Sequence, residues 1–315
     1  MSNKADDLSL VLPILVFPIE RKPKPALITI STFVAFSFFM ATLTSLVLEL
    51  FQKHITESAA PISETEAGGI AALINLIYML LAVVLMTLFL IVMIRYGKIA
   101  LIRILIAGLM SYLIFTFTLY MGMLTGAYFL VLAYNYLNFA ISSTIVDILY
   151  YSALVLSAIF VGIYLLSATK GRLLTARNII LTINVTWMGV WMSWNMGELT
   201  PIALLIGFAL YDLYSVLKGP LKQLAETLRR DIGGEKEEEF GLGFGLGDVF
   251  FYSFAIGYSL AVLTLIETIV VCVVLLAGTL VTIILLFKTK AEALPALPIP
   301  VLSAVALILM FRYVV

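Results

Sequence analysis

Residues 240–253 read FGLGFGLGDVFFYS, an alternating run of glycines that ends in one carboxylate, Asp248, inside an apolar segment. Glycine has no Cβ, so such a run lets another segment approach the backbone closely where the chain passes from water into lipid. An aspartate within a bilayer costs about 2.5–3.5 kcal/mol, so a chain that retains one generally has a use and a partner for it. Asp212, in the preceding apolar segment, is the partner that the sequence offers.

The composition excludes a soluble protein. Hydrophobic residues make up 63% of the 315 residues and charged residues only 12%, in long apolar runs separated by short polar links. This pattern predicts an all-α polytopic membrane protein, and the zero net charge gives no indication of a nucleic-acid partner. The nine transmembrane helices that we expect are 26–50, 70–94, 103–123, 145–168, 178–196, 199–217, 245–264, 267–287 and 296–314.

The spans divide the chain into four parts. Residues 1–25 form a cytoplasmic, interfacial segment, because their apolar piece is too short to cross and is broken by prolines. Residues 26–217 hold spans one to six, and residues 245–315 hold spans seven to nine. The link between them, 218–244, contains an amphipathic surface helix at 221–230.

The distribution of basic residues predicts the orientation of the chain, and it depends on how residues 127–141 are interpreted. These residues are apolar but rich in Tyr and Asn, and they form a tenth crossing, a re-entrant segment or an extension of a neighbouring span. With nine spans, 17 of the 19 basic residues lie on one side, leaving Lys53 and Arg312 on the other. A tenth crossing would destroy this asymmetry. By the positive-inside rule, the amino terminus is cytoplasmic and the carboxyl terminus lies outside the cell membrane.

Few residue types remain for catalysis. The single histidine, His54, lies in a polar link away from the acids, and the single cysteine, Cys272, cannot form an internal disulfide. No HExxH pair exists, so we expect neither a metal nor a cofactor. Aspartate and glutamate are left for acid–base chemistry.

Asp212 and Asp248 form the candidate catalytic pair. Asp212 lies roughly 9 Å below the cytoplasmic edge, at about 1.5 Å per residue from Lys218, and Asp248 lies just inside the same edge. Two carboxylates at one depth can share a proton, so that one activates a water and the other protonates the substrate. This is the equipment of an aspartic protease. Two other hypotheses stay open: a structural hydrogen bond between helices, and an ion- or proton-coupled transporter.

Three motifs stand around these acids: FALYDLYSVLKGPLKQLAETLRR (208–230), GLGDVFFYS (245–253) and LPALP (294–298). They closely resemble the YD, GxGD and PAL motifs of the presenilin and signal-peptide-peptidase class of intramembrane aspartyl proteases. The resemblance extends from about Ile102 to the end and is greatest to prokaryotic, archaeal-type presenilin homologues. It implies a presenilin-like bundle that hydrolyses peptide bonds within transmembrane helices of membrane-protein substrates.

The resemblance also implies a set of site residues. Asp212 and Asp248 correspond to the two catalytic acids. The residues that it places at the active site or against the substrate are Tyr211, Gly245, Leu246, Gly247, Pro295, Ala296 and Leu297. Leu246, the middle residue of GxG, influences the choice of cleavage site in the family. Tyr252, at i+4 from Asp248, is either a hydrogen-bond donor to that carboxylate or an ordinary interfacial aromatic residue.

The predicted orientation is similar to that of presenilin and opposite to that of signal peptide peptidase. The link 218–244 is much shorter than the long presenilin loop, which puts self-cleavage in doubt. The compact chain leads us to expect that accessory subunits are not required, so its partners are the bilayer and its substrates. The resemblance implies that a substrate becomes extended and pairs as a strand beside the GxGD and PAL segments.

Overall fold

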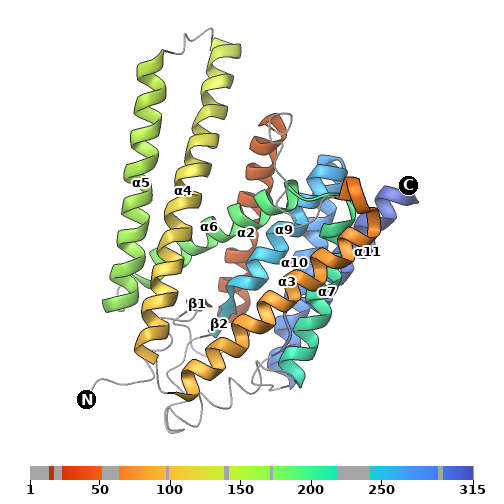
Figure 1. Ribbon diagram of the computed structural model, residues 1–315. Coiled ribbons are helices and arrows are strands. Elements are labelled where there is room, and N and C mark those ends of the chain that lie inside the picture. Colours follow the sequence, from red (N-terminus) through yellow and green to blue (C-terminus); the bar gives the residue numbers. More distant parts are fainter. Residues whose placement is uncertain are drawn as a thin grey trace.

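The computed structural model describes residues 14–17, 23–51, 64–96, 99–137, 142–170, 173–218, 242–289 and 294–314. Within these ranges the chain forms nine helices and one two-stranded antiparallel sheet (Figure 1). The helices are α2 (Pro23–Phe51), α3 (Glu64–Arg95), α4 (Ile99–Leu137), α5 (Ser143–Lys170), α6 (Leu174–Trp194), α7 (Leu199–Leu217), α9 (Leu246–Val262), α10 (Leu265–Thr289) and α11 (Pro298–Tyr313). Each predicted span overlaps one helix, which confirms the predicted fold class.

Six of the described helices are long and apolar enough, by length and composition, to cross a membrane. They are α2, α3, α4, α5, α7 and α10. Two shorter apolar helices, α9 and α11, complete the carboxyl-terminal part of the bundle. The chain is therefore an integral membrane protein, and the number of crossings stays a prediction.

The ambiguous segment 127–141 continues the third predicted span. Helix α4 runs without a break from Ile99 to Leu137 and lies beside α5 as a long pair (Figure 1). Gly122 and Gly126 permit this pairing, since a Cβ at Gly122 would lie 3.3 Å from the Cβ of Ala153, and Gly126 makes room for Leu149. The extension is thus the correct one of the three interpretations as far as Leu137, while residues 138–141 lie outside the described part.

The amino-terminal segment contains a strand that the sequence analysis did not predict. Strand β1 (Ile14–Phe17) pairs antiparallel with β2 (Leu242–Gly245), with Ile14 opposite Gly245. The alternating glycines were expected to allow close approach of another segment, with a substrate as the strand that pairs beside them. In the structure β1 of the same chain pairs with this stretch. The predicted surface helix at 221–230 lies outside the described residues.

Helix α9 forms the centre of the bundle. It packs against α2, α6, α7, α10 and α11, and its residues 252–260 are buried without interruption. Two glycines bring α6 and α9 together: a Cβ at Gly189 would lie 2.6 Å from the carbonyl oxygen of Phe250, and a Cβ at Gly257 would lie 3.0 Å from the Cα of Val190. This close packing fixes the helix that carries Asp248.

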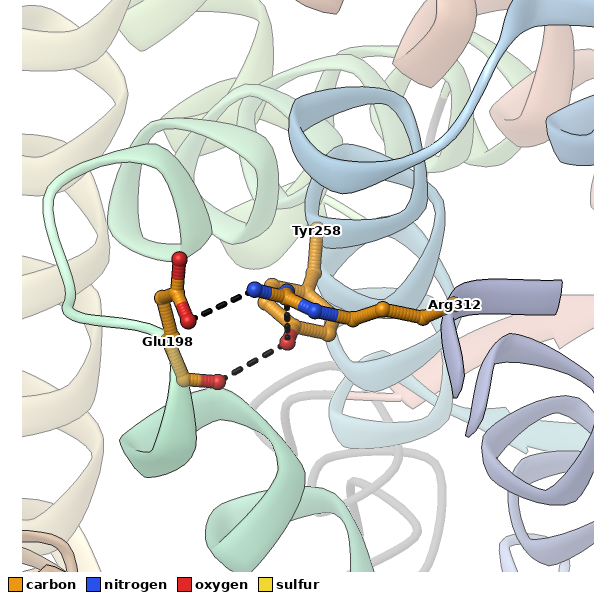
Figure 2. A network of polar contacts seen from close by, with 3 residues as sticks. All are labelled: Glu198, Tyr258 and Arg312. Carbon is orange, nitrogen blue, oxygen red and sulfur yellow. Dashed lines mark hydrogen bonds and ion pairs between the residues drawn. The ribbon is translucent and has the colours of Figure 1, made fainter. Parts of the chain in front are cut away.

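A polar cluster joins α9 and α11 to the turn before α7. Figure 2 shows Arg312 beside Glu198, with the Arg312 Nη2 atom 2.6 Å from the Glu198 carboxylate. The Tyr258 hydroxyl donates to the Glu198 carbonyl at 2.8 Å and accepts from Arg312 Nη1 at 3.2 Å. The three helices that carry or adjoin the predicted motifs are therefore connected at the end remote from Asp212 and Asp248.

Gly278→Ala should destabilise the contact between α10 and α11. A Cβ at Gly278 would lie 2.6 Å from the Cα and 3.0 Å from the nitrogen of Pro300, and neither backbone atom can move without shifting α11. Overpacking of this kind costs about 1–3 kcal/mol, so the thermal unfolding midpoint in detergent should fall. Gly162→Ala in α5 is the control, because nothing lies within 4 Å of a Cβ there. Equal midpoints for the two variants would contradict the packing argument.

Candidate active site

Three parts of the fold meet at Asp212 and Asp248. Asp212 lies in the last two turns of α7, Asp248 lies in the first turn of α9, and the segment 294–297 precedes α11. Both aspartates are half-buried, and they are close enough for their charges to interact. The structure therefore brings together the two acids that the sequence analysis paired.

A backbone amide holds the Asp212 carboxylate. The N–H of Leu297 donates to Asp212 Oδ2 at 3.1 Å. Hydrogen bonds to an ionised acceptor are roughly twice as strong as neutral ones. The predicted PAL segment thus contacts a catalytic candidate through its backbone, and the side chain of Leu297 is buried in the core.

Local helix chemistry explains the placement of Asp248. Gly245 is the N-cap of α9 in an extended conformation, which puts Asp248 at the third helical position. The Asp248 carboxylate lies against the backbone of Gly245, which is both the last residue of β2 and the N-cap of α9. The start of α9 therefore places this carboxylate beside the end of β2.

The two glycines of GxG have different surroundings. A Cβ at Gly245 would lie 2.7 Å from Asp248 Oδ2, so this glycine makes room for the carboxylate. Gly247 is exposed, and nothing lies within 4 Å of a Cβ built on it. Leu246, between them, is only 5% exposed and belongs to the core. Any effect of Leu246 on cleavage would therefore pass through packing.

The two tyrosines singled out in the sequence have different surroundings. The Tyr211 ring packs against Phe208 with centroids 6.5 Å apart, and its hydroxyl has no hydrogen-bond partner among the described residues. Tyr252 is completely buried, and its hydroxyl donates to the carbonyl oxygen of Ala296 at 2.9 Å. A phenol has one proton, so the interpretation of Tyr252 as a donor to Asp248 is wrong. Its complete burial makes the other interpretation, an interfacial aromatic residue, wrong as well.

The remaining predicted residues lie in the same region. Pro295 and Ala296 are half-buried in the segment that contacts Asp212. Within the described part of the chain, no group of three His, Cys, Asp or Glu side chains could hold a metal ion. What the site offers is two carboxylates, a backbone amide and an open space at Gly247.

Known proteins resemble this chain in sequence and in fold. Residues 228–315 match the family model of presenilin, a range that includes Asp248 and Pro295–Leu297 but not Asp212. A solved structure described as a presenilin family intramembrane aspartate protease superposes with a TM-score of 0.59, covering 92% of this chain and 99% of the other at 19% identity. The chain has the presenilin fold. No curated protein sequence matches it.

The resemblance predicted from the motifs is confirmed by these matches. The presenilin match begins at residue 228, after Asp212, and the hydrogen bond from Leu297 connects Asp212 to the matched part. In this fold α7, α9 and α11 contact one another, so the three motifs, which are far apart in the sequence, lie in one region.

Proposed function

We propose that this chain is an intramembrane aspartyl endopeptidase that hydrolyses peptide bonds within transmembrane helices of membrane-protein substrates. The observation that carries the proposal is the meeting of Asp212 and Asp248, from two separate apolar helices, beside the backbone of Ala296 and Leu297. The presenilin match and fold support this class of enzyme.

Asp212 and Asp248 share one proton in the proposed mechanism. The ionised carboxylate takes a proton from water as the water oxygen attacks the substrate carbonyl carbon. The protonated carboxylic acid donates to the carbonyl oxygen, and proton transfer to the amide nitrogen then lets the carbon–nitrogen bond break. Water and one peptide bond are consumed, and a carboxyl and an amino terminus are formed.

The substrate must be unwound before this attack. A helical carbonyl is already bonded to an amide four residues away and is shielded by side chains. The open space at Gly247 gives an extended substrate backbone access to Asp248. Because β1 covers one edge of β2, an incoming strand would use the other edge or displace β1.

Incubation with a peptide tests the proposal. The purified chain in lipid is mixed with a single-span helical peptide, and the products are identified by mass spectrometry. New peptide termini in the half of the span near Asp212 and Asp248 support a protease that works without accessory subunits. An intact peptide accompanied by a proton or cation flux across vesicles would favour the transporter instead.

The proposed orientation puts the amino terminus and the acidic site at the cytoplasmic face of the cell membrane. It rests on the distribution of 17 basic residues against two. In a Cys272→Ser background, Lys218→Cys should react with an impermeant thiol reagent only from the cytoplasmic side. A tag placed after Val315 should be accessible only from outside. Accessibility of both from one side would contradict the three crossings that the nine-span prediction places between Lys218 and Val315.

A further inference from the structure

The peptide unit between Ala296 and Leu297 has two polar partners. Its carbonyl oxygen accepts a hydrogen bond from the Tyr252 hydroxyl at 2.9 Å. Its N–H donates to Asp212 Oδ2 at 3.1 Å. The carbonyl and the N–H belong to one planar group, so the orientation of one fixes the orientation of the other.

Tyr252 and Asp248 have a fixed relation to each other. They lie at i and i+4 on α9, and side chains with this spacing lie on the same helix face. Tyr252 therefore lies one helical turn from Asp248 and is linked to Asp212 through one peptide unit. This link joins α9 to α7 by way of the segment before α11.

The environment of Tyr252 leaves its ring little freedom. The side chain is fully buried, and its ring meets Phe38 of α2 edge to face with centroids 6.2 Å apart. A ring enclosed in this way can hold the Ala296 carbonyl in one position.

We propose that Tyr252 is a positioning residue for the reaction: its hydroxyl holds the Ala296–Leu297 peptide unit and thereby holds the Asp212 carboxylate in register with Asp248. A carbonyl that accepts a hydrogen bond polarises its peptide unit and makes the attached N–H a better donor. The hydroxyl thus acts on Asp212 without touching it. This role rests on the proposed protease function.

Tyr252→Phe tests the role of the hydroxyl, because it removes one oxygen and retains the buried ring. We expect kcat for peptide cleavage to fall about tenfold, as expected for the loss of one buried hydrogen bond that positions a reacting group, while KM changes less than about twofold. Replacement of Tyr252 by 4-aminophenylalanine, which has a donor at the same ring position, should restore most of kcat.

Tyr258→Phe is a matched control. Tyr258 lies on the same helix and its hydroxyl also donates to a backbone carbonyl, that of Glu198, but at the end remote from the aspartates. It should lower the thermal midpoint about as much as Tyr252→Phe and leave kcat within about twofold of wild type. Equal kcat values for the two variants would show that Tyr252 has only a structural role.

Amide hydrogen exchange gives a readout that needs no activity. Pro295 and Pro298 have no amide hydrogen, so exchange over residues 295–298 reports only Ala296 and Leu297. Tyr252→Phe should accelerate this exchange about tenfold, and Tyr258→Phe should not. Unchanged exchange in Tyr252→Phe would overturn the proposal even if the wild-type chain cleaves peptides. Accelerated exchange in Tyr252→Phe, together with a wild-type chain that cleaves nothing, would instead overturn the proposed function alone.

Discussion

Asp212→Asn and Asp248→Asn should each lower peptide cleavage by about 10²–10⁴-fold, the range that one acid–base group contributes. An asparagine amide can neither take a proton from water nor deliver one to the substrate. Each acid has a separate task in every turnover, so the double variant should be no worse than either single variant. Product formation by all three variants in one lipid, followed by mass spectrometry, measures these effects.

Asp147→Asn provides the control for the removal of an acid from an apolar helix. Asp147 lies on α5, is exposed in the structure, and has no place at the site. This variant should retain wild-type turnover. The thermal midpoints of the Asp212 and Asp248 variants should not fall, since an amide oxygen still accepts hydrogen bonds and the variant side chain carries no charge.

The shared proton also predicts a bell-shaped pH–rate profile for the wild-type chain. The doubly protonated pair lacks a base, and the doubly ionised pair lacks an acid, so only the intermediate state is active. Wild-type turnover by either single Asn variant would make the pair structural and restore the transporter hypothesis.

Gly245→Ala should cause the second large loss of peptide-cleavage activity. The Gly245 backbone is extended, with φ −67° and ψ 134°, so alanine fits it without strain. The added Cβ would lie 2.7 Å from Asp248 Oδ2, and the carboxylate, as the end of a side chain, is what moves. We expect kcat to fall by about 10²-fold, a loss that a displacement of about 1 Å can cause, with the thermal midpoint nearly unchanged.

Gly247→Ala tests whether activity is lost because Asp248 is displaced or because the GxGD motif tolerates no added side chain at either glycine. Its Cβ would enter open space, so the fold and Asp248 should be undisturbed. If an extended substrate occupies that space, KM should rise while kcat changes little. The measurement is steady-state cleavage of one peptide by both variants. A fall of kcat in Gly247→Ala as large as that in Gly245→Ala would contradict the different roles of the two glycines.

The fold was largely predictable because it follows from local hydropathy. Each apolar run forms one helix. Only the end of α4 could not be predicted from hydropathy alone, because it depends on the packing of Gly122 and Gly126 against Ala153 and Leu149 of α5. Strand β1 could not be predicted. Four apolar residues between prolines give no periodicity long enough to identify a strand, and its partner lies at the far end of the chain.

The acids were predictable and their supports were not. Asp212 and Asp248 are conspicuous because each is a charge in an apolar run at a similar distance from the basic link. Tyr252 gave a misleading signal, since its i+4 spacing pointed to Asp248 while its proton goes to Ala296, more than forty residues away. Contacts between helices depend on how the bundle packs, which no local spacing encodes.

The pairing of β1 with β2 affects the order in which this chain can mature. β1 precedes every helix described here, and β2 follows six of them, so β1 has no partner strand while α2 to α7 are synthesised. Asp212 likewise lacks its backbone donor until the segment before α11 has been made. Pairings between such distant segments form late. We therefore expect a partly synthesised chain to be unable to cut neighbouring helices in the membrane, so that proteolysis begins only with the finished bundle.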